Sequence, residues 1–235
     1  MIAPTQNQIK KVLTEDLGKI FEMAICLLYE TPFEGNFKYN IDDAMTLMNS
    51  IRGLKEVFPL PLIHTAKNGN QYDFEVYDCS YVKLSAKTTK KDGKVCPQVI
   101  GQPSKKRFCS YFNLPDTLTM EEIKTHIEHN TSSILDVYFN YTFDCPIVYY
   151  NKKTSTVLFI RNIHRIDWDK YQINFSHAIK NKVWNESTTI KISNIPIGEF
   201  QVHNHRDCIK FRWCFEKLLK TFPDCFEIDE IPFIK

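Results

Sequence analysis

Residues 72–88 read YDFEVYDCSYVKLSAKT, and polar and apolar side chains alternate along this segment. A side-chain period of two is typical of β-strands, so the segment predicts a strand over 72–77, a turn, and a second strand over 81–88. In such a hairpin Asp73 and Glu75 share one face of the first strand. Ser85 and Lys87 share the polar face of the second, so two carboxylates and a lysine are expected on one side of a sheet.

These side chains suit metal-assisted cleavage of a phosphodiester. A carboxylate can hold a divalent cation, and a nearby lysine can stabilise the anion that develops during the reaction. The alternative is an ordinary solvent-facing sheet surface, on which alternating polar residues are common. Alternation by itself favours that second interpretation, so the decision depends on the surrounding sequence.

The composition is that of a folded protein. The chain has 235 residues, of which 43% are hydrophobic and 13% aromatic, enough for a packed core. With only 7 glycines and 11 prolines, extended disorder is disfavoured. The net charge of +2 neither requires nor excludes nucleic acid as a partner, because a nuclease needs only a local basic surface.

The eight cysteines are scattered and form no CxxC pair. This spacing argues against a cysteine zinc site and a disulfide framework, and it favours buried thiols in a reducing cytoplasm. The N-terminus lacks a basic region followed by an apolar core, and no apolar run reaches membrane-spanning length. We therefore expect a soluble, cytoplasmic protein without a signal peptide and with no membrane as a partner.

Helical and strand-like patterns follow one another along the chain. Apolar residues recur at helical spacing over residues 9–28, which predicts a first helix. A second helix is expected at 42–54, with Ala44, Met45, Met48 and Ile51 facing the core. The capping box Thr119–Glu122 is expected to start another helix, and a further one is expected at 134–139. A last helix is expected at 207–222, with Asp207 as its cap. Further strands are expected at 62–66, 146–150, 156–161 and 199–203, with the turn Asn68-Gly69 leading into the strand 72–77. This order predicts an α/β fold with a central mixed β-sheet flanked by helices.

The hairpin resembles the PD-(D/E)xK nuclease superfamily and, within it, the type II restriction endonucleases. The family motif is an acidic residue on one strand, followed on the next strand by an acidic residue, any residue and a lysine. Asp73 matches the first position and Lys87 matches the lysine. Ser85 stands where the second carboxylate usually lies, and Tyr72 replaces the proline before the aspartate.

The resemblance extends to a helix ahead of the hairpin, on which Glu22 points outward as in the first helix of many such nucleases. It covers about residues 10–110 and implies a restriction-endonuclease-like core. Residues 140–235 are then expected to complete the sheet and the DNA-binding surface, so that residues 1–235 form a single nuclease domain.

The resemblance implies a type II restriction endonuclease that hydrolyses double-stranded DNA at a short specific sequence. Asp73 and Glu75 are expected to bind Mg²⁺, with Glu22 as the other candidate for the carboxylate missing at Ser85. Lys87 is expected to orient the attacking water or to neutralise charge in the transition state. The resemblance also implies a cognate DNA methyltransferase in the same host, and a palindromic site would imply a homodimer.

A basic, glutamine-containing stretch follows the second strand. Its lysines and arginine are candidates for phosphate contacts, and its glutamines could read adenine in the major groove. The alternative is a solvated run of charges. The candidate DNA-binding residues here are Lys90, Lys91, Lys94, Gln98, Gln102, Lys105, Lys106 and Arg107.

A second candidate for DNA contact lies near the C-terminus. His203, Asn204, His205 and Arg206 are expected in a turn before a helix N-terminus, where Asn and Arg could read bases and phosphate would be favoured. Ordinary turn chemistry is one alternative. Metal binding by His203 and His205 is another, for which the neighbouring sequence shows no third ligand.

Two rival functions remain open from the sequence. One is a DNA repair or low-specificity nicking nuclease with the same chemistry. The other is a non-catalytic nucleic-acid-binding domain, which the serine at position 85 would fit.

Overall fold

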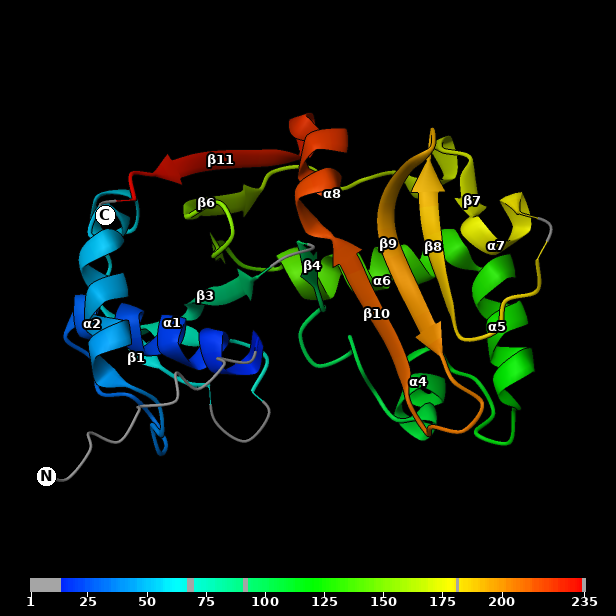
Figure 1. The fold of residues 1–235 in the computed structure, drawn as a ribbon, viewed down its shortest axis with the longest axis horizontal. Coiled ribbons are helices and arrows are strands. Elements are labelled where there is room, and N and C mark those ends of the chain that lie inside the picture. The colour runs from blue at the N-terminus through cyan, green and yellow to red at the C-terminus, as the bar shows by residue number, and fades with distance from the viewer. Residues whose placement is uncertain (1–13, 67–69, 91–92, 181, 234–235) are drawn as a thin grey trace, which may run out of the picture.

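The computed structural model describes residues 14–66, 70–90, 93–180 and 182–233. The chain forms two β-sheets with helices between and around them (Figure 1). One sheet has six strands in the order β1-β2-β3-β5-β6-β11, and the other has five in the order β4-β10-β9-β8-β7. The predicted α/β fold with a central mixed sheet flanked by helices is therefore confirmed.

The six-stranded sheet is mixed because one of its pairings is parallel. Strand β3 runs parallel to β5, with Lys87 opposite Tyr149, while its other neighbours pair antiparallel. The predicted hairpin of 146–150 with 156–161 is present as β5 and β6. The strands of this sheet are β1 (Leu62–His64), β2 (Phe74–Val76), β3 (Cys79–Thr89), β5 (Ile147–Asn151), β6 (Thr156–Asn162) and β11 (Phe226–Ile231).

The five-stranded sheet is antiparallel throughout. Four of its strands come from the part of the chain between β6 and β11, so most of this sheet is an insertion between two strands of the first sheet. Its strands are β4 (Lys94–Val95), β7 (Ile173–Phe175), β8 (Ser187–Ile192), β9 (Ile195–Val202) and β10 (Ile209–Cys214).

The helices surround and separate the sheets. The predicted capping box is confirmed, because Thr119 and Glu122 cap each other's backbone at the start of α5. The described helices are α1 (Thr14–Tyr29), α2 (Ile41–Ser50), α3 (Leu54–Val57), α4 (Lys105–Tyr111), α5 (Met120–His129), α6 (Thr131–Phe143), α7 (Ser176–Ile179) and α8 (Phe215–Thr221), with 3-10 turns at Trp168–Lys170 and Pro223–Cys225.

Strand β5 is buried on both faces. Val148 and Tyr150 face α1, where the ring of Phe21 lies 5.5 Å from that of Tyr150. Ile147 and Tyr149 face the opposite core, beside α6. Continuous apolar runs are typical of strands covered on both sides, which explains why this segment alternates so little in the sequence.

Helix α6 lies between the two sheets and joins their cores. Tyr138 stacks on Phe211 of β10 with ring centroids 4.4 Å apart, and the indole N–H of Trp213 donates to Thr142 Oγ1 at 2.9 Å. On its other side, Phe139 packs against Phe226 of β11. The layers are therefore α1 with α2, the six-stranded sheet, α6, and the five-stranded sheet (Figure 1).

The predicted helix over 207–222 is wrong. Residues 209–214 form strand β10, and helix α8 begins only at Phe215. Ile209, Phe211 and Trp213 are each fully buried and alternate with half-buried polar residues. This period of two, with β-branched and aromatic side chains, is the strand signal that outweighs Asp207 as a helix cap.

Smaller corrections concern the first elements. Helix α2 ends at Ser50, and Leu47 faces the core while Met45 is 47% exposed, contrary to the predicted stripe. Residues 9–13 of the predicted first helix and the turn Asn68-Gly69 lie outside the described residues. Within the described part of the chain, no helix is both long and apolar enough to cross a membrane.

Candidate active site

The hairpin β2–β3 brings Asp73 and Lys87 together. Asp73 lies just before β2, and its carbonyl accepts from the backbone N–H of Thr65 at 2.9 Å. Its Oδ2 accepts a hydrogen bond from the backbone N–H of Ala86 at 2.8 Å and lies 3.7 Å from Nζ of Lys87. The side chains of Lys87 and Asp73 are 16% and 18% exposed, so the pair is half-buried but open to solvent.

The charge of Asp73 is only partly balanced. Burial raises the pKa of this carboxyl above its usual value, Lys87 opposes that rise, and the nearby negative charge of Glu22 adds to it. A carboxylate that is costly to ionise would be stabilised by a bound cation. Perturbed groups of this kind cluster at functional sites.

Glu22 of α1 is held in a fixed position. Its Oε2 accepts from Nζ of Lys19 at 2.6 Å and lies 3.2 Å from Nε2 of His64, which is 1% exposed. Nδ1 of His64 accepts from the backbone N–H of Glu34 at 2.8 Å, so Nε2 carries the ring proton and donates it to Glu22. The sequence placed no carboxylate beside His64, because this contact joins α1 to β1.

Glu75 points to a different partner. It forms an ion pair with Lys83, its cross-strand neighbour in the hairpin. Besides burial, the negative charge of Glu22 is one of the main causes that raise the pKa of Asp73. Of the two carboxylates proposed to replace the one missing at Ser85, the structure thus brings Glu22 toward Asp73 and occupies Glu75 with a lysine.

Ser85 is fully buried and belongs to a hydrogen-bonded chain. The thiol of Cys145 donates to Ser85 Oγ at 3.6 Å, and Ser85 in turn contacts the amide of Gln98. With the amide oriented to satisfy all its neighbours, its oxygen faces Ser85 and lies 3.3 Å from Nζ of Lys87. Its nitrogen then donates to the carbonyl of Tyr141 at 3.0 Å.

Gln98 therefore lies beside Lys87 and not on a DNA-reading surface. It is 7% exposed, so its amide cannot reach a base edge in this arrangement. The sequence indicated neither its contact with Ser85 nor that with Lys87, because Gln98 comes from an irregular loop. Gly101 in the same loop has no room for a side chain, since a Cβ would lie 2.4 Å from the carbonyl of Pro97.

Cys145 is a structural thiol. Burial raises its pKa to about 12, so it is protonated at neutral pH and donates its hydrogen bond to Ser85. The thiolate is the nucleophilic form of cysteine. Covalent catalysis by this residue is therefore excluded, although it lies close to Lys87.

The residues before Asp73 are anchored to the end of α6. The hydroxyl of Tyr72 and the amide of Gln71 both donate to Oδ2 of Asp144 at 2.6 Å. Nζ of Lys83 also lies over the ring of Tyr72, 5.3 Å from its centroid. These contacts hold the backbone that carries Asp73 against the core.

The basic stretch after β3 divides into paired and exposed side chains. Lys94 forms an ion pair with Glu199 of β9, and Nζ of Lys105 donates to the carbonyl of Leu118 at 2.8 Å. Lys90 is half-buried and also has a partner, and Lys91 lies outside the described residues. The residues of this stretch that remain exposed are Gln102, Lys106 and Arg107.

His203 to Arg206 lie in the turn between β9 and β10, because the expected helix is strand β10. Asn204, His205 and Arg206 are exposed, while His203 is half-buried. The carbonyl of Pro103 accepts from the backbone N–H of Ile209 at 3.1 Å, which joins the loop before α4 to the start of β10. Helix α4 and the β9–β10 turn thus lie at the same end of the five-stranded sheet (Figure 1).

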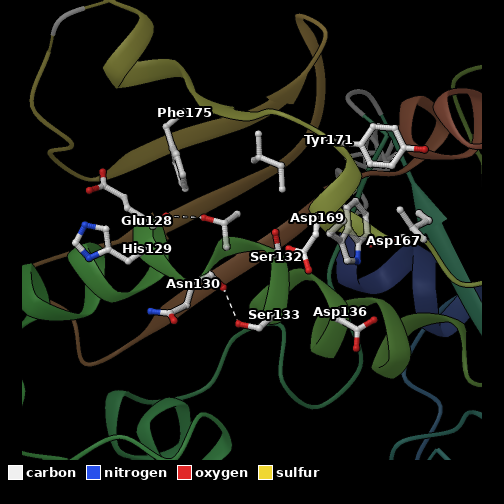
Figure 2. Close-up of a pocket in the computed structure, with 14 residues that line it drawn as sticks. Glu128, His129, Asn130, Ser132, Ser133, Asp136, Asp167, Asp169, Tyr171 and Phe175 are labelled. Carbon is white, nitrogen blue, oxygen red and sulfur yellow. Dashed lines mark hydrogen bonds between the residues drawn. The ribbon is translucent and has the colours of Figure 1, made fainter.

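A separate hollow lies between the junction of α5 with α6 and the segment 166–175 (Figure 2). Its wall carries Glu128, Asp136, Asp167 and Asp169. These carboxylates would repel a DNA phosphate, and none of the residues around Asp73 lines the hollow. It is therefore no candidate for the nuclease site.

This chain is similar to a type II restriction enzyme. It is 47% identical over 218 residues, or 92% of its length, to the type II restriction enzyme CviAII of Paramecium bursaria Chlorella virus 1. The chain spans 63% of the length of that relative. No family model and no solved structure match the chain.

Proposed function

We propose that this protein is a type II restriction endonuclease of the PD-(D/E)xK kind, which hydrolyses double-stranded DNA at a short specific sequence with Mg²⁺. The observation that carries the proposal is the hairpin in which Asp73 and Lys87 lie 3.7 Å apart beside the charge of Glu22. The similarity to CviAII supports the same activity. Residues 1–235 would act as one nuclease domain.

The residues around Asp73 fit a magnesium ion. Asp73 and Glu22 supply carboxylate oxygens, which Mg²⁺ prefers, and Oδ1 of Asp73 and Oε1 of Glu22 make no hydrogen bond to a described residue. Burial and Glu22 together make the ionised form of Asp73 costly, and a cation would remove that cost. We assign the metal-binding role to Asp73 and Glu22, with Glu75 as the less favoured candidate because Lys83 holds it.

A bound Mg²⁺ would polarise the scissile phosphate and lower the pKa of the attacking water. Lys87 carries three N–H donors, and its Nζ lies 3.7 Å from Oδ2 of Asp73 and 3.3 Å from the amide oxygen of Gln98. The third donor can orient the attacking water or stabilise charge on the phosphate in the transition state. The protein itself would thus contribute the positively charged ammonium group of Lys87, held next to the metal ligands.

Gln98, Ser85 and Cys145 would position Lys87. Cys145 donates to Ser85, Ser85 donates to the amide oxygen of Gln98, and the ammonium group of Lys87 donates to the same oxygen. A lysine side chain has four flexible bonds, and holding its end in place lowers the entropic cost of the productive geometry. Ser85 would therefore replace the missing carboxylate in position but not in role.

DNA contact would come from the exposed basic groups of α4 and the β9–β10 turn. Lys106 and Arg107 are suited to phosphates, and Asn204 and Arg206 are the residue types that read adenine and guanine. Gln102 is exposed in the loop between them and the active site. A homodimer and a cognate methyltransferase would follow if the recognition sequence is palindromic and the host must protect its own DNA.

Digestion of a mixed-sequence plasmid with Mg²⁺, followed by sequencing of the fragment ends, tests the proposal. Discrete fragments with one common end sequence support a restriction enzyme. A smear or nicked circles would instead indicate a nuclease with little sequence preference. Binding of DNA without cleavage would indicate the non-catalytic alternative and overturn the proposal.

A further inference from the structure

We propose that Glu186, His203 and His205 form a binding site for a divalent transition-metal ion of the Zn²⁺ class, separate from the Asp73 site. His203 and His205 lie in the β9–β10 turn, and Glu186 lies just before β8. One ligand atom from each of the three residues lies within 4.8 Å of the other two. The sequence showed the two histidines, and the structure supplies the third ligand.

The distances between these atoms suit a tetrahedral ion. Nδ1 of His203 lies 3.4 Å from Oε1 of Glu186, and Nδ1 of His205 lies 3.8 Å from the same oxygen. Ligands bound to Zn²⁺ at about 2.1 Å with tetrahedral angles lie about 3.4 Å apart. The first of these pairs already has this spacing and the second needs an adjustment of a few tenths of an ångström, while the ligand nitrogens of the two histidines lie within 4.8 Å of each other.

A second observation concerns Nδ1 of His203, which lies beside the carboxylate of Glu186. This atom is buried and makes no hydrogen bond to a described residue. A buried polar atom without a partner is uncommon in proteins and often marks an unseen ion or water. The His205 ring lies 5.4 Å from that of His203, so the two imidazoles lie side by side.

The backbone around the site is held without the metal. Nζ of Lys124, a residue that is 4% exposed, donates to the carbonyls of Trp184 and Asn185 at 3.1 and 2.6 Å and lies 3.4 Å from Oδ1 of Asn204. The carbonyl of Glu186 accepts from the N–H of Val202 at 2.8 Å. These bonds fix the segment before β8 against the β9–β10 turn, so the ligands lose little freedom when an ion binds.

The chemistry of the ligands sets the class of ion. Two imidazole nitrogens and one carboxylate oxygen suit Zn²⁺, Co²⁺ or Ni²⁺, whereas Mg²⁺ prefers oxygen ligands alone. Glu186 and His205 are exposed, so a fourth position remains open to water. The ion would fix the turn that carries Asn204 and Arg206.

The experiment is a Zn²⁺ titration of chelator-treated full-length protein against a chromophoric competitor, in excess Mg²⁺ so that oxygen sites are filled. We expect one Zn²⁺ per chain. His203→Ala, His205→Ala and Glu186→Gln should each weaken binding by at least about 10–100-fold, the cost usual even for outer ligands. His164→Ala, an exposed histidine elsewhere, and Asp73→Asn should bind like the parent.

The eight cysteines make a cobalt spectrum the decisive second readout. Co²⁺ held by imidazole and carboxylate gives ligand-field bands without a thiolate charge-transfer band, and a thiolate band would overturn the proposal. Absence of stoichiometric Zn²⁺ binding by the parent, or unchanged binding in the three variants, would also overturn it. Variants are compared only after circular dichroism shows the parent's fold, and a Zn²⁺-dependent rise in the parent's melting temperature should be absent in folded His205→Ala.

Discussion

Two carboxylates with little exposure to solvent, Asp73 just before strand β2 and Glu199 in strand β9, differ in how their charge is balanced. Asp73 beside the six-stranded sheet has Lys87 at 3.7 Å, and burial together with Glu22 still raises its pKa. Glu199 in the five-stranded sheet is also buried, but Lys94 and Arg212 outweigh that burial and lower its pKa. Gln201 donates a further hydrogen bond to Glu199 at 2.6 Å.

The difference separates a carboxylate whose charge is balanced within the protein from one that fits the metal-binding role proposed above. Glu199 is satisfied within the protein, so its ion pairs hold β4, β9 and β10 together. The charge of Asp73 is opposed by burial and by Glu22 and only partly offset by Lys87, and a bound cation would offset it further. Burial alone would not have distinguished the two residues.

The largest expected effect is on cleavage. Asp73→Asn and Lys87→Ala should each lower kcat/KM for plasmid cleavage by about 10²–10³-fold or more, because charge stabilisation in the transition state is lost. Lys83→Ala, which removes the neighbouring lysine of the same strand, is the matched control and should stay within a few-fold of the parent. An equal loss of cleavage in Lys83→Ala and Lys87→Ala would contradict a specific role for Lys87.

The second carboxylate can be identified by a matched pair of variants. Glu22→Gln should lower cleavage by about 10²-fold and raise the Mg²⁺ concentration needed for half-maximal rate, since one metal ligand is lost. Glu75→Gln should change neither quantity beyond a few-fold, because Lys83 already holds that side chain. The reverse result would assign the metal to Asp73 and Glu75.

Glu199 should matter for stability, whereas Asp73 should matter for cleavage. Glu199→Ala leaves Lys94 and Arg212 without a counter-charge, so the free energy of unfolding in urea should fall by about 2 kcal/mol. Glu227→Ala, which removes an exposed partner of Arg161, should cost about 0–1 kcal/mol and is the control. A loss in Glu199→Ala no larger than in the control would mean that Glu199 is not a structural anchor.

The two carboxylates should also give opposite pH dependences. The lowered pKa of Glu199 supports stability above its unfolded value of 4.5, and this support is lost as pH falls through the folded pKa. The raised pKa of Asp73 means that its ionisation costs stability as pH rises above its unfolded value of 3.8 in metal-free protein. Urea unfolding over a range of pH should therefore show that Glu199→Gln loses less stability in acid and that metal-free Asp73→Asn gains at neutral pH.

The same shift predicts how Mg²⁺ binds. Because a proton competes for Asp73 at higher pH than for an ordinary carboxyl, the Mg²⁺ requirement of cleavage should rise as pH falls. Calorimetry in buffers of different ionisation enthalpy should show that Mg²⁺ binding to the parent releases more protons as the pH falls. Asp73→Asn should show a smaller release, and equal proton release by both proteins at every pH would place the raised pKa elsewhere.

The smallest effect concerns the basic surface. Lys106→Ala and Arg107→Ala should each weaken DNA binding a few-fold on any sequence and reduce the slope of log affinity against log salt by about 1, as expected for one lost phosphate contact. Lys220→Ala, an exposed lysine of α8, is the control and should leave the salt dependence unchanged. An unchanged slope in the first two variants would move the DNA surface away from α4.

Local patterns predicted much of the six-stranded sheet. The alternation at residues 72–88 located the hairpin, and the apolar spacing of residues 9–28 located α1, because both signals lie within one element. The same reasoning failed at β10, where Asp207 before a run of large apolar residues resembles a capped helix. The alternation of Ile209, Phe211 and Trp213 with polar residues is the strand signal there, and pairing with β9 satisfies it.

The site was harder to predict than the fold. Asp73 and Lys87 could be predicted from the sequence because the period of two in the strands places them on one face. The contacts of Glu22 with His64, and of Gln98 with Ser85 and Lys87, join elements far apart in the chain or come from loops without periodicity. No spacing rule encodes such contacts, and the pairing of Glu75 with Lys83 is visible only once the register of the hairpin is known.

The position of β11 has a consequence for synthesis of the protein. This strand forms the edge of the six-stranded sheet beside β6, although the inserted strands β7 to β10 separate β6 from β11 in the chain. Its last residue, Ile231, is 1% exposed and packs against Gly53 near α3. The sheet that follows Asp73 and carries Lys87 is therefore not complete until residue 231 has emerged from the ribosome, so a nascent chain would acquire this core only after that point.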